Sequence, residues 1–386
     1  MNSFSHEIIS QLIAAESPCY YYDMRLLQAT LKACKQAADA HHFKVHYALK
    51  ANFNEPILAA INQHGFGADC VSGNEVMQAI KTGFNPYEIV FAGVGKTDKE
   101  ILNALQHDIF CFNVESVEEL RIINELAASQ HKTARIAIRI NPNVDAKTHQ
   151  YITTGLEENK FGVNAWELND CIEVLKQSPN LELIGIHFHV GSQVKDLDVF
   201  KSLCLKVNEF NTWFADRGFN LRILNVGGGL GVDYYHPNEQ PMVDFEAYFA
   251  IFNQFLERKK GQEVHFELGR SLVAACGTLI SRVLYIKKGL KKNFMILDAG
   301  MTELMRPALY QAYHKIENLS RIDEESALNY DVVGPICEST DTFGKEVELP
   351  ESQRGDLIAI RTAGAYGEVM VSRYNLREPI QAVYSA

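Results

Sequence analysis

Paired cysteines and long apolar runs are both missing from this sequence. The eight cysteines stand alone, and none belongs to a CxxC pair or to a Cys/His spacing typical of a zinc site. We therefore expect reduced thiols, mostly buried, and no bound metal. No apolar stretch reaches the roughly twenty residues that a membrane helix needs, and Met1–Glu16 has no basic segment followed by an apolar run. These absences predict a cytoplasmic protein without a signal peptide or a membrane span.

A basic surface is also missing. Lysine and arginine number 37 against 48 acidic residues, which gives a formal net charge of -11. Charges of both signs are interspersed, and the short lysine pairs at 287–288 and 291–292 are typical of a solvated loop. A nucleic-acid partner needs a basic face, so none is expected. The 47% hydrophobic and 22% charged residues are ordinary for a globular chain.

Apolar, β-branched runs alternate with amphipathic stretches over residues 44–267. The stretches 55–64, 73–82 and 117–129 repeat apolar residues at three- and four-residue spacing, which predicts helices. Alternation of strand and helix is typical of a parallel sheet. Eight such strands favour a closed (β/α)8 barrel over an open sheet. The expected strands are 44–50, 67–71, 88–92, 109–114, 135–140, 183–189, 223–226 and 264–267.

After about residue 275 strand-like runs follow one another with few helices between them. That order predicts an antiparallel β domain of the sandwich or barrel-like kind. A length of 386 residues also favours two domains. We therefore predict an α/β protein with a barrel over 25–275 and a β domain made of 1–24 and 276–386, whose sheet the early run Cys19–Tyr22 could join. The expected strands of this domain are 277–285, 294–298, 330–333, 356–361 and 379–384.

Chemically active residues follow four of the predicted barrel strands. The first strand ends in YALKAN, the sixth in HFHVGSQ, the seventh in GGGLG and the eighth in ELGR. Taken singly, Lys50 is most simply a solvated surface lysine, and His189 is most simply a half-buried histidine whose hydrogen bonds are satisfied. A glycine run is often only a flexible turn, and Glu267 with Arg270 could be an ion pair. Active sites of such barrels form at the carboxyl ends of the strands, so the four motifs together predict one site at the barrel mouth.

The set meets the chemical needs of pyridoxal phosphate. A lysine that is desolvated at the barrel mouth can have a neutral amine, and a neutral amine can form an imine with the cofactor aldehyde. Backbone N–H groups of a glycine run, with no Cβ in the way, can bind the phosphate together with Ser192. A carboxylate such as Glu267 can keep the ring nitrogen protonated, through an interaction of roughly 4 kcal/mol at about 4 Å. The sequence therefore predicts a pyridoxal-phosphate site around Lys50.

The same four motifs resemble the fold-type III pyridoxal-phosphate decarboxylases, the family of ornithine, arginine and diaminopimelate decarboxylases. The resemblance implies that Lys50 carries the cofactor and that His189 stacks on its ring. It places Ser192 and Gly229 at the phosphate and Glu267 at the ring nitrogen. One departure is Leu268, where the family has proline, and it leaves both functional neighbours in place. Further cofactor contacts are implied for Asp69, Gly228, Gly269, Arg270 and Tyr366.

Further motifs narrow the resemblance to the diaminopimelate decarboxylases. They are MRPALY at 305–310, CESTD at 337–341, GAYG at 364–367 and TGLEENKFG at 154–162. The resemblance implies that Arg270, Arg306 and Tyr310 hold the substrate's distal carboxylate, because an arginine fork donates two parallel hydrogen bonds to such a group. It further implies that Glu338 holds the distal ammonium and that Tyr366 lies near cofactor and substrate.

The activity implied is decarboxylation of meso-diaminopimelate at its D-centre to L-lysine, the last step of lysine biosynthesis. Cys337 is the implied proton donor, with Lys50 as the alternative. In the family Cys337 and Glu338 reach the neighbouring subunit's site, which implies a homodimer with shared active sites. Three alternatives stay open: a decarboxylase for arginine or carboxynorspermidine, an amino-acid racemase, and a non-catalytic homologue. The paired arginines and CESTD argue against the first, and the retained Lys50 and Cys337 argue against the last.

Overall fold

The computed structural model describes residues 4–144 and 160–385. The chain divides into two compact units. The β unit comprises Met1–Thr30, Val232–Val243 and Arg270–Ala386, and the barrel unit comprises Leu31–Gly231 and Asp244–Gly269. Among the helices in the described ranges, none combines the length and the apolar character that crossing a membrane requires.

Eight parallel strands close a barrel in the barrel unit, in the order β2-β3-β4-β5-β6-β7-β8-β9, with β9 pairing back to β2. Val90, Ala137 and Ile184 belong to a buried cluster that spans five neighbouring strands. The (β/α)8 architecture predicted from the sequence is confirmed. The strands are β2 (Lys44–Ala48), β3 (Gly67–Cys70), β4 (Ile89–Phe91), β5 (Cys111–Val114), β6 (Ala134–Arg139), β7 (Leu181–His187), β8 (Ile223–Asn225) and β9 (Glu263–Leu268).

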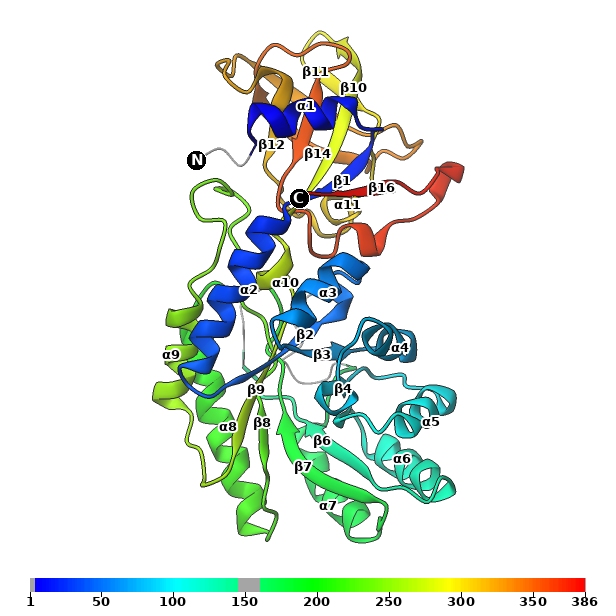
Figure 1. The fold of residues 1–386 in the computed structure, drawn as a ribbon, viewed down its shortest axis with the longest axis vertical. Coiled ribbons are helices and arrows are strands. Elements are labelled where there is room, and N and C mark those ends of the chain that lie inside the picture. Colours follow the sequence, from blue (N-terminus) through cyan, green and yellow to red (C-terminus); the bar gives the residue numbers. More distant parts are fainter. Residues whose placement is uncertain (1–3, 145–159, 386) are drawn as a thin grey trace. The chain divides into compact units, whose positions relative to one another are not determined.

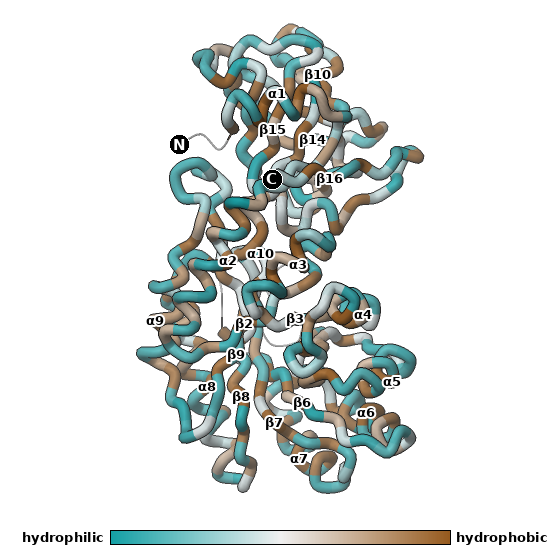
Figure 2. Tube along the Cα trace, viewed as in Figure 1, coloured by the Kyte–Doolittle hydropathy of each residue, from teal (hydrophilic) through white to brown (hydrophobic). Residues whose placement is uncertain are grey.

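Helices follow the barrel strands and surround them (Figure 1). Ser72, Thr97 and Ser116 begin three of these helices, and each side chain accepts a hydrogen bond from the backbone N–H three residues on. Hydrophobic and hydrophilic residues alternate along the helices (Figure 2), as expected where one face is buried. The helices are α2 (Met24–Asp39), α3 (Glu55–Gln63), α4 (Gly73–Lys81), α5 (Asp98–Gln106), α6 (Val117–Ser129), α7 (Leu168–Lys176), α8 (Asp198–Asp216) and α9 (Phe245–Phe255), with 3-10 turns η1 (Leu49–Ala51), η2 (Pro86–Glu88) and η3 (Ala165–Glu167).

The β unit is built on an eight-stranded, mostly antiparallel sheet. Its main path is β12-β15-β10-β11-β13-β14, and β1 (Cys19–Tyr22) pairs with β10 and β16. The predicted β domain is therefore confirmed, and so is the return of Cys19–Tyr22 to its sheet. Helix α1 (His6–Ala14) buries Ile8 and Leu12 in a cluster with Ile280. The other elements are β10 (Gly277–Lys288), β11 (Asn293–Leu297), β12 (Ile316–Asn318), β13 (Leu328–Val333), β14 (Thr342–Leu349), β15 (Leu357–Ile360), β16 (Gln381–Tyr384), α10 (Arg270–Val273), α11 (Arg306–Tyr310), η4 (Leu319–Arg321), η5 (Glu368–Met370) and η6 (Tyr374–Leu376).

Three details differ from the sequence prediction. Strands β12 and β14 are missing from the prediction, because β12 is only three residues long and β14 is an edge strand with exposed charged residues at 345, 346 and 348. The first barrel strand ends at Ala48, where the chain turns into η1, so Lys50 stands on a 3-10 turn. The segments 25–30, 232–243 and 270–275, predicted within the barrel domain, group with the β unit, in the case of Tyr234 through a contact with Arg306.

Candidate active site

A buried carboxylate, Glu267, lies near the carboxyl end of β9. Its Oε1 accepts hydrogen bonds from the side-chain amides of Asn113 (2.9 Å) and Asn225 (2.7 Å). Its Oε2 lies 2.8 Å from His187 Nε2. Burial by itself raises the pKa of Glu267, but His187, Lys50 and Asn225 more than offset it, so that the pKa lies below its usual value. Each carboxylate oxygen has about two acceptor sites, so Oε2 retains room for one further donor.

Asn113, Asn225 and His187 are absent from the predicted site residues. Each is a polar side chain in the buried part of a barrel strand. A polar residue in an otherwise apolar strand is costly unless it is hydrogen-bonded, so the pattern could have marked all three as members of a network. What the pattern could not give is the shared partner, which for Asn113 is 154 residues away along the chain.

Lys50 and Asp69 form an ion pair, with 3.9 Å between Lys50 Nζ and Asp69 Oδ2. The Asp69 side chain is buried in β3, whereas 40% of the Lys50 side chain is exposed. Burial raises the pKa of Asp69 well above its usual range, Glu267 raises it further, and Lys50 opposes both. Asp69 Oδ1 is buried and makes no hydrogen bond within the described residues. The structure thus brings two of the predicted cofactor residues together and leaves one polar atom unsatisfied beside them.

The glycine run after β8 packs against backbone with no room for side chains. A Cβ at Gly228 would lie 2.0 Å from the carbonyl oxygen of Glu267. Gly229 has a φ of +109°, in the region that residues with a Cβ rarely adopt. Gly269, which follows β9, is less crowded, because its Cβ would lie 3.1 Å from the Cβ of Ala51. The run adds no side chain to this loop, so its backbone can come close to an anion, although the N–H of Gly227 already donates to Asn225 Oδ1 at 3.0 Å.

His189 follows β7 and is held by the glycine run. The backbone N–H of Gly228 donates to His189 Nδ1 at 3.4 Å, so the proton of the neutral ring is on Nε2. Burial, with the positive charges of Arg139 and Lys50, lowers the pKa of His189 well below its usual range. Ser192 is partly buried in the turn that follows. A neutral imidazole and a hydroxyl therefore stand near the predicted glycine cradle.

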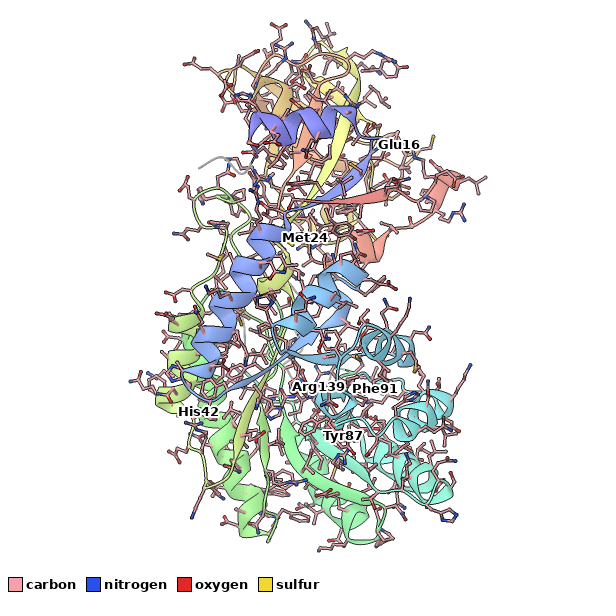
Figure 3. The ribbon with its side chains drawn as sticks, viewed as in Figure 1. Glu16, Met24, His42, Tyr87, Phe91 and Arg139 are labelled. Atoms are coloured by element: carbon pink, nitrogen blue, oxygen red, sulfur yellow. The ribbon has the colours of Figure 1, made fainter. Side chains whose placement is uncertain are left out.

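A second ion pair, between Arg139 and Glu115, joins the carboxyl ends of β5 and β6 to the segment that follows residue 159. Neither residue was among the predicted site residues. Arg139, which ends β6 and is labelled in Figure 3, donates through Nη1 to both carboxylate oxygens of Glu115, at 2.8 and 3.1 Å. Glu115 also accepts the backbone N–H of Gly162 at 3.0 Å, and the Arg139 guanidinium lies 4.8 Å from the centre of the Phe161 ring. Within the predicted motif 154–162, residues up to 159 lie outside the described part of the chain.

Two predicted arginines of the β unit share one phenol oxygen. Nη1 of Arg270 and Nη1 of Arg306 donate to the hydroxyl oxygen of Tyr234 at 2.6 and 3.0 Å. Both guanidinium groups belong to buried residues, 7% and 6% exposed. The Arg270 guanidinium also lies over the ring of Tyr366, 4.8 Å from its centre, and Tyr310 ends the helix that Arg306 begins. The structure thus brings predicted substrate residues together around Tyr234, which the sequence did not single out.

Arg306 has only uncharged hydrogen-bond partners within residues 4–144 and 160–385. They are the hydroxyl of Tyr234 and Nε2 of His314, the latter at 2.9 Å. His314 Nδ1 donates to the carbonyl of Arg361, so its Nε2 is an acceptor. Burial lowers the pKa of His314 to about 3, and the charge of Arg306 adds to this. A buried positive charge without a counter-charge is costly, so this cluster has the character of an anion site.

Cys337 and Glu338 lie exposed between β13 and β14. The backbone N–H of Cys337 donates to Asn375 Oδ1 at 3.0 Å. The other seven cysteines are buried, as expected, and all eight are unpaired. In the part of the chain that the structure describes, no hydrogen bond or ion pair joins Cys337 or Glu338 to Arg306.

Known proteins are similar to this chain in sequence and in fold. The family model for the pyridoxal binding domain of pyridoxal-dependent decarboxylases matches residues 25–274. The diaminopimelate decarboxylase of Bacteroides thetaiotaomicron is 54% identical over 371 residues, which cover 96% of this chain and 96% of that protein. The diaminopimelate decarboxylase of Helicobacter pylori strain J99 is 44% identical over 376 residues, 97% of this chain and 91% of that one.

Solved structures agree with the sequence comparisons. The crystal structure of diaminopimelate decarboxylase from Helicobacter pylori complexed with L-lysine has a TM-score of 0.92 and 42% identity, and the match covers 99% of this chain and 94% of that chain. Identity at this level over nearly the whole length establishes more than a shared fold. The chain belongs to the diaminopimelate decarboxylase family of pyridoxal-dependent decarboxylases.

Proposed function

We propose that this enzyme decarboxylates meso-diaminopimelate at its D-centre and releases L-lysine and carbon dioxide. The observation that carries the substrate assignment is Arg306, a buried guanidinium whose hydrogen-bond partners in the described residues are all uncharged. A substrate with a second carboxylate, far from the reacting carbon, supplies the missing negative charge. The relatives named above are diaminopimelate decarboxylases, and one solved relative is complexed with L-lysine.

The barrel residues fit pyridoxal phosphate. A cradle in which a Cβ at Gly228 would meet the carbonyl of Glu267 at 2.0 Å suits a phosphate group, as does the nearby hydroxyl of Ser192. Asp69 Oδ1, which makes no hydrogen bond in the described residues, and the remaining acceptor site on Glu267 Oε2 can each accept a hydrogen bond from a ligand. When bound, the cofactor supplies an aldehyde that bonds to an amine and a ring that accepts the electrons released by the departing carboxylate.

Each barrel residue then has one task. Lys50 is the residue that would hold the cofactor, through a covalent bond between Nζ and the cofactor aldehyde. His189 presents a neutral ring face, fixed by the hydrogen bond from Gly228 at 3.4 Å, against which a flat ring can stack. Glu267, kept ionised by its buried hydrogen-bond donors, would accept a hydrogen bond from the protonated nitrogen of the cofactor ring and so favour the protonated form of that nitrogen. We place the phosphate at Ser192, Gly228 and Gly229, and propose Gly269, which follows β9, as a further cofactor contact.

In the β unit the proposed tasks concern the far end of the substrate. Arg270, Arg306 and Tyr310 bind the distal carboxylate, because two guanidinium groups and a phenol supply several donors to it. Glu338 binds the distal ammonium. Tyr366, whose φ of +55° is uncommon for a residue with a Cβ, holds the Arg270 guanidinium over its ring and contacts cofactor and substrate.

Cys337 completes the reaction by protonating the carbon from which carbon dioxide leaves. The bond from the D-centre to its carboxylate breaks, the electron pair stays on carbon, and the proton comes from the thiol, with Lys50 Nζ as the alternative donor. Cys337 and Glu338 are exposed on the single chain, which is what residues need if they are to reach a partner's site. We therefore propose a cytoplasmic homodimer with shared active sites.

Product analysis tests the assignment directly. Purified enzyme supplied with pyridoxal phosphate and meso-diaminopimelate is expected to release one carbon dioxide and one L-lysine per substrate. Rates on ornithine, arginine and carboxynorspermidine are expected to be lower by at least about a hundredfold, because those substrates lack the distal carboxylate or its geometry. Comparable rates on any of them would overturn the substrate assignment, and loss of optical activity without carbon dioxide would indicate a racemase instead.

A further inference from the structure

The terminal nitrogen Nη1 of Arg306 has both of its hydrogens in use. One donates to the hydroxyl oxygen of Tyr234 at 3.0 Å and the other to His314 Nε2 at 2.9 Å. Since the guanidinium is planar and rigid, two bonds on one nitrogen fix both its position and the orientation of its plane. The edge that remains for a ligand is the one formed by Nε and Nη2, whose N–H bonds run parallel and match the two oxygens of a carboxylate.

Tyr234 also couples this arginine to a second one. Its hydroxyl oxygen accepts from Arg270 at 2.6 Å as well as from Arg306, so both of its acceptor sites are occupied. Two like charges that share one buried pocket repel each other, and a common acceptor holds them as a pair. The Tyr234 ring adds packing to the polar contacts, because the Arg306 guanidinium lies 4.9 Å from its centre.

A hydrogen bond on Nδ1 fixes the ring of His314, so that its Nε2 points as an acceptor toward Arg306. Its Nδ1 donates to the carbonyl of Arg361 at 2.8 Å, so Nε2 faces Arg306 with a lone pair. The rings of His314 and Tyr234 meet edge to face, with centroids 5.1 Å apart and planes at 79°. Neither ring can turn without losing this contact and a hydrogen bond to Arg306.

We propose that Tyr234 and His314 are positioning residues for recognition of the distal carboxylate. By occupying Nη1 of Arg306 they turn its Nε and Nη2 edge to the ligand, and through the shared phenol oxygen they hold Arg270 as the second arm of the same anion site. The inference rests on the proposed function and deepens it, since it names what sets the geometry of the substrate arginines. These two residues act through the arginines and are not assigned a contact with substrate.

Binding of two diamines to the loaded enzyme separates this role from a general effect on folding. L-Lysine retains the carboxylate that the site is proposed to recognise, and 1,5-diaminopentane lacks it. Isothermal titration of Tyr234→Phe is expected to give about tenfold weaker L-lysine binding, which corresponds to about 1.4 kcal/mol, and unchanged diaminopentane binding. In turnover the KM for meso-diaminopimelate is expected to rise while kcat falls by less than about threefold.

Two further comparisons distinguish positioning from loss of a buried polar group. Tyr248→Phe removes another buried tyrosine hydroxyl, one without a hydrogen-bond partner in the described residues, and is expected to leave both affinities unchanged. His314→Gln retains an acceptor for Arg306 and is expected to bind L-lysine within about threefold of wild type, whereas His314→Leu is expected to lose about tenfold.

The possible failures point to different errors. If Tyr234→Phe and His314→Leu bind L-lysine as wild type does while Arg306→Gln binds it at least about tenfold more weakly, the positioning role is wrong and the carboxylate site stands. If Arg306→Gln also binds L-lysine normally, the proposed substrate contact itself is wrong. Equal weakening of L-lysine and diaminopentane by Tyr234→Phe would also overturn the inference, because it would mean a disturbance unrelated to the carboxylate.

Discussion

His187 Nε2 lies 2.8 Å from Glu267 Oε2, and both side chains are buried. His187, with the charge of Lys50 and the hydrogen bond from Asn225, holds the pKa of Glu267 below its usual value in spite of burial. The consequence is that a carboxylate is maintained in the interior of the barrel before any ligand arrives. The proposed reaction needs a protonated nitrogen in the cofactor ring. Only the ionised form of Glu267 can stabilise that proton by accepting a hydrogen bond from the nitrogen.

Replacing His187 by Leu is expected to destabilise the cofactor-free protein by about 3 kcal/mol at neutral pH, because it leaves Glu267 short of a donor. In wild type the pKa of Glu267 is depressed, so its stabilising effect is present above the ordinary carboxyl pKa and is lost only as the pH falls through the lower folded value. In the variant the pKa rises, and the loss of stability therefore shrinks as the solution is made more acidic. Urea unfolding at about pH 7.5 and about pH 5.5 measures this difference.

The same His187→Leu change in a Glu267→Gln background supplies the control. Without a carboxylate to support, its effect on stability is expected to be the same at both pH values. An equal loss at both pH values in the wild-type background would contradict the coupling between the two residues.

His46 is expected to make the protein sensitive to mild acid. Its Nδ1 bonds the carbonyl of Glu88 at 3.0 Å and its Nε2 lies 2.8 Å from His265 Nδ1. Burial, with His265 adding, lowers the pKa of His46 to about 3. A histidine whose folded pKa is depressed stabilises the fold above its unfolded pKa, and this stability is lost as the pH falls below that value. The expected loss from this one residue is about 2 kcal/mol between about pH 6.5 and about pH 5.

His46→Gln tests whether His46 is the titrating group, through the slope of the unfolding free energy against pH rather than through its absolute value. The variant is expected to be less stable near neutral pH, and its unfolding free energy is expected to fall less steeply on acidification, by about 1.4 kcal/mol per pH unit. Parallel pH profiles for the two proteins would mean that His46 is not the titrating group.

Lys50→Ala is expected to abolish the visible absorbance of the bound cofactor and to reduce turnover by on the order of a thousandfold or more, because Lys50 is the amine proposed to hold the aldehyde. Lys50→Arg is the matched variant, since it keeps a positive charge near Asp69 but cannot form the bond. Dialysed samples of both are compared with wild type by absorption spectroscopy. Survival of the visible band in either variant would refute the assignment of Lys50.

The proposed sharing of active sites between subunits makes a separate prediction about mixtures. Lys50→Ala and Cys337→Ala proteins are each expected to be nearly inactive, with Cys337→Ala lowering kcat more than it changes KM. After unfolding and refolding together, half of the dimers carry one intact site, so about a quarter of wild-type activity is expected. Refolding each variant alone is the control, and a mixture no more active than its components would exclude sharing of Cys337 between subunits.

Much of the architecture could be predicted because it follows from local patterns. The alternation of buried strands with amphipathic helices gave all eight barrel strands to within a few residues, and it placed Lys50 and Glu267 after or near strand ends. The edge strand β14 escaped prediction because its exposed charged residues weaken the apolar signal. The turn at η1 escaped because Leu49 and Ala51 are buried and read as a continuation of the strand.

The supporting residues of the site could not be predicted in the same way. Tyr234 stands in a segment predicted to belong to the barrel, yet its partners Arg270 and Arg306 lie 36 and 72 residues further on. Nothing local marks His314 as the acceptor for Arg306, since its role depends on a carbonyl 47 residues away. Roles of this kind arise from tertiary contacts, and a single sequence contains no record of them.

The close approach of Gly228 to the carbonyl oxygen of Glu267, together with the hydrogen bond from the Glu267 N–H to the carbonyl of Gly227 at 2.8 Å, has a mechanical consequence. The backbone proposed to hold one end of the cofactor follows β8, the residue proposed to hold the other end belongs to β9, and the two segments are in direct contact. A change that separates these two segments would therefore alter the distance between the proposed phosphate site and Glu267, and with it the length of the molecule that fits between them.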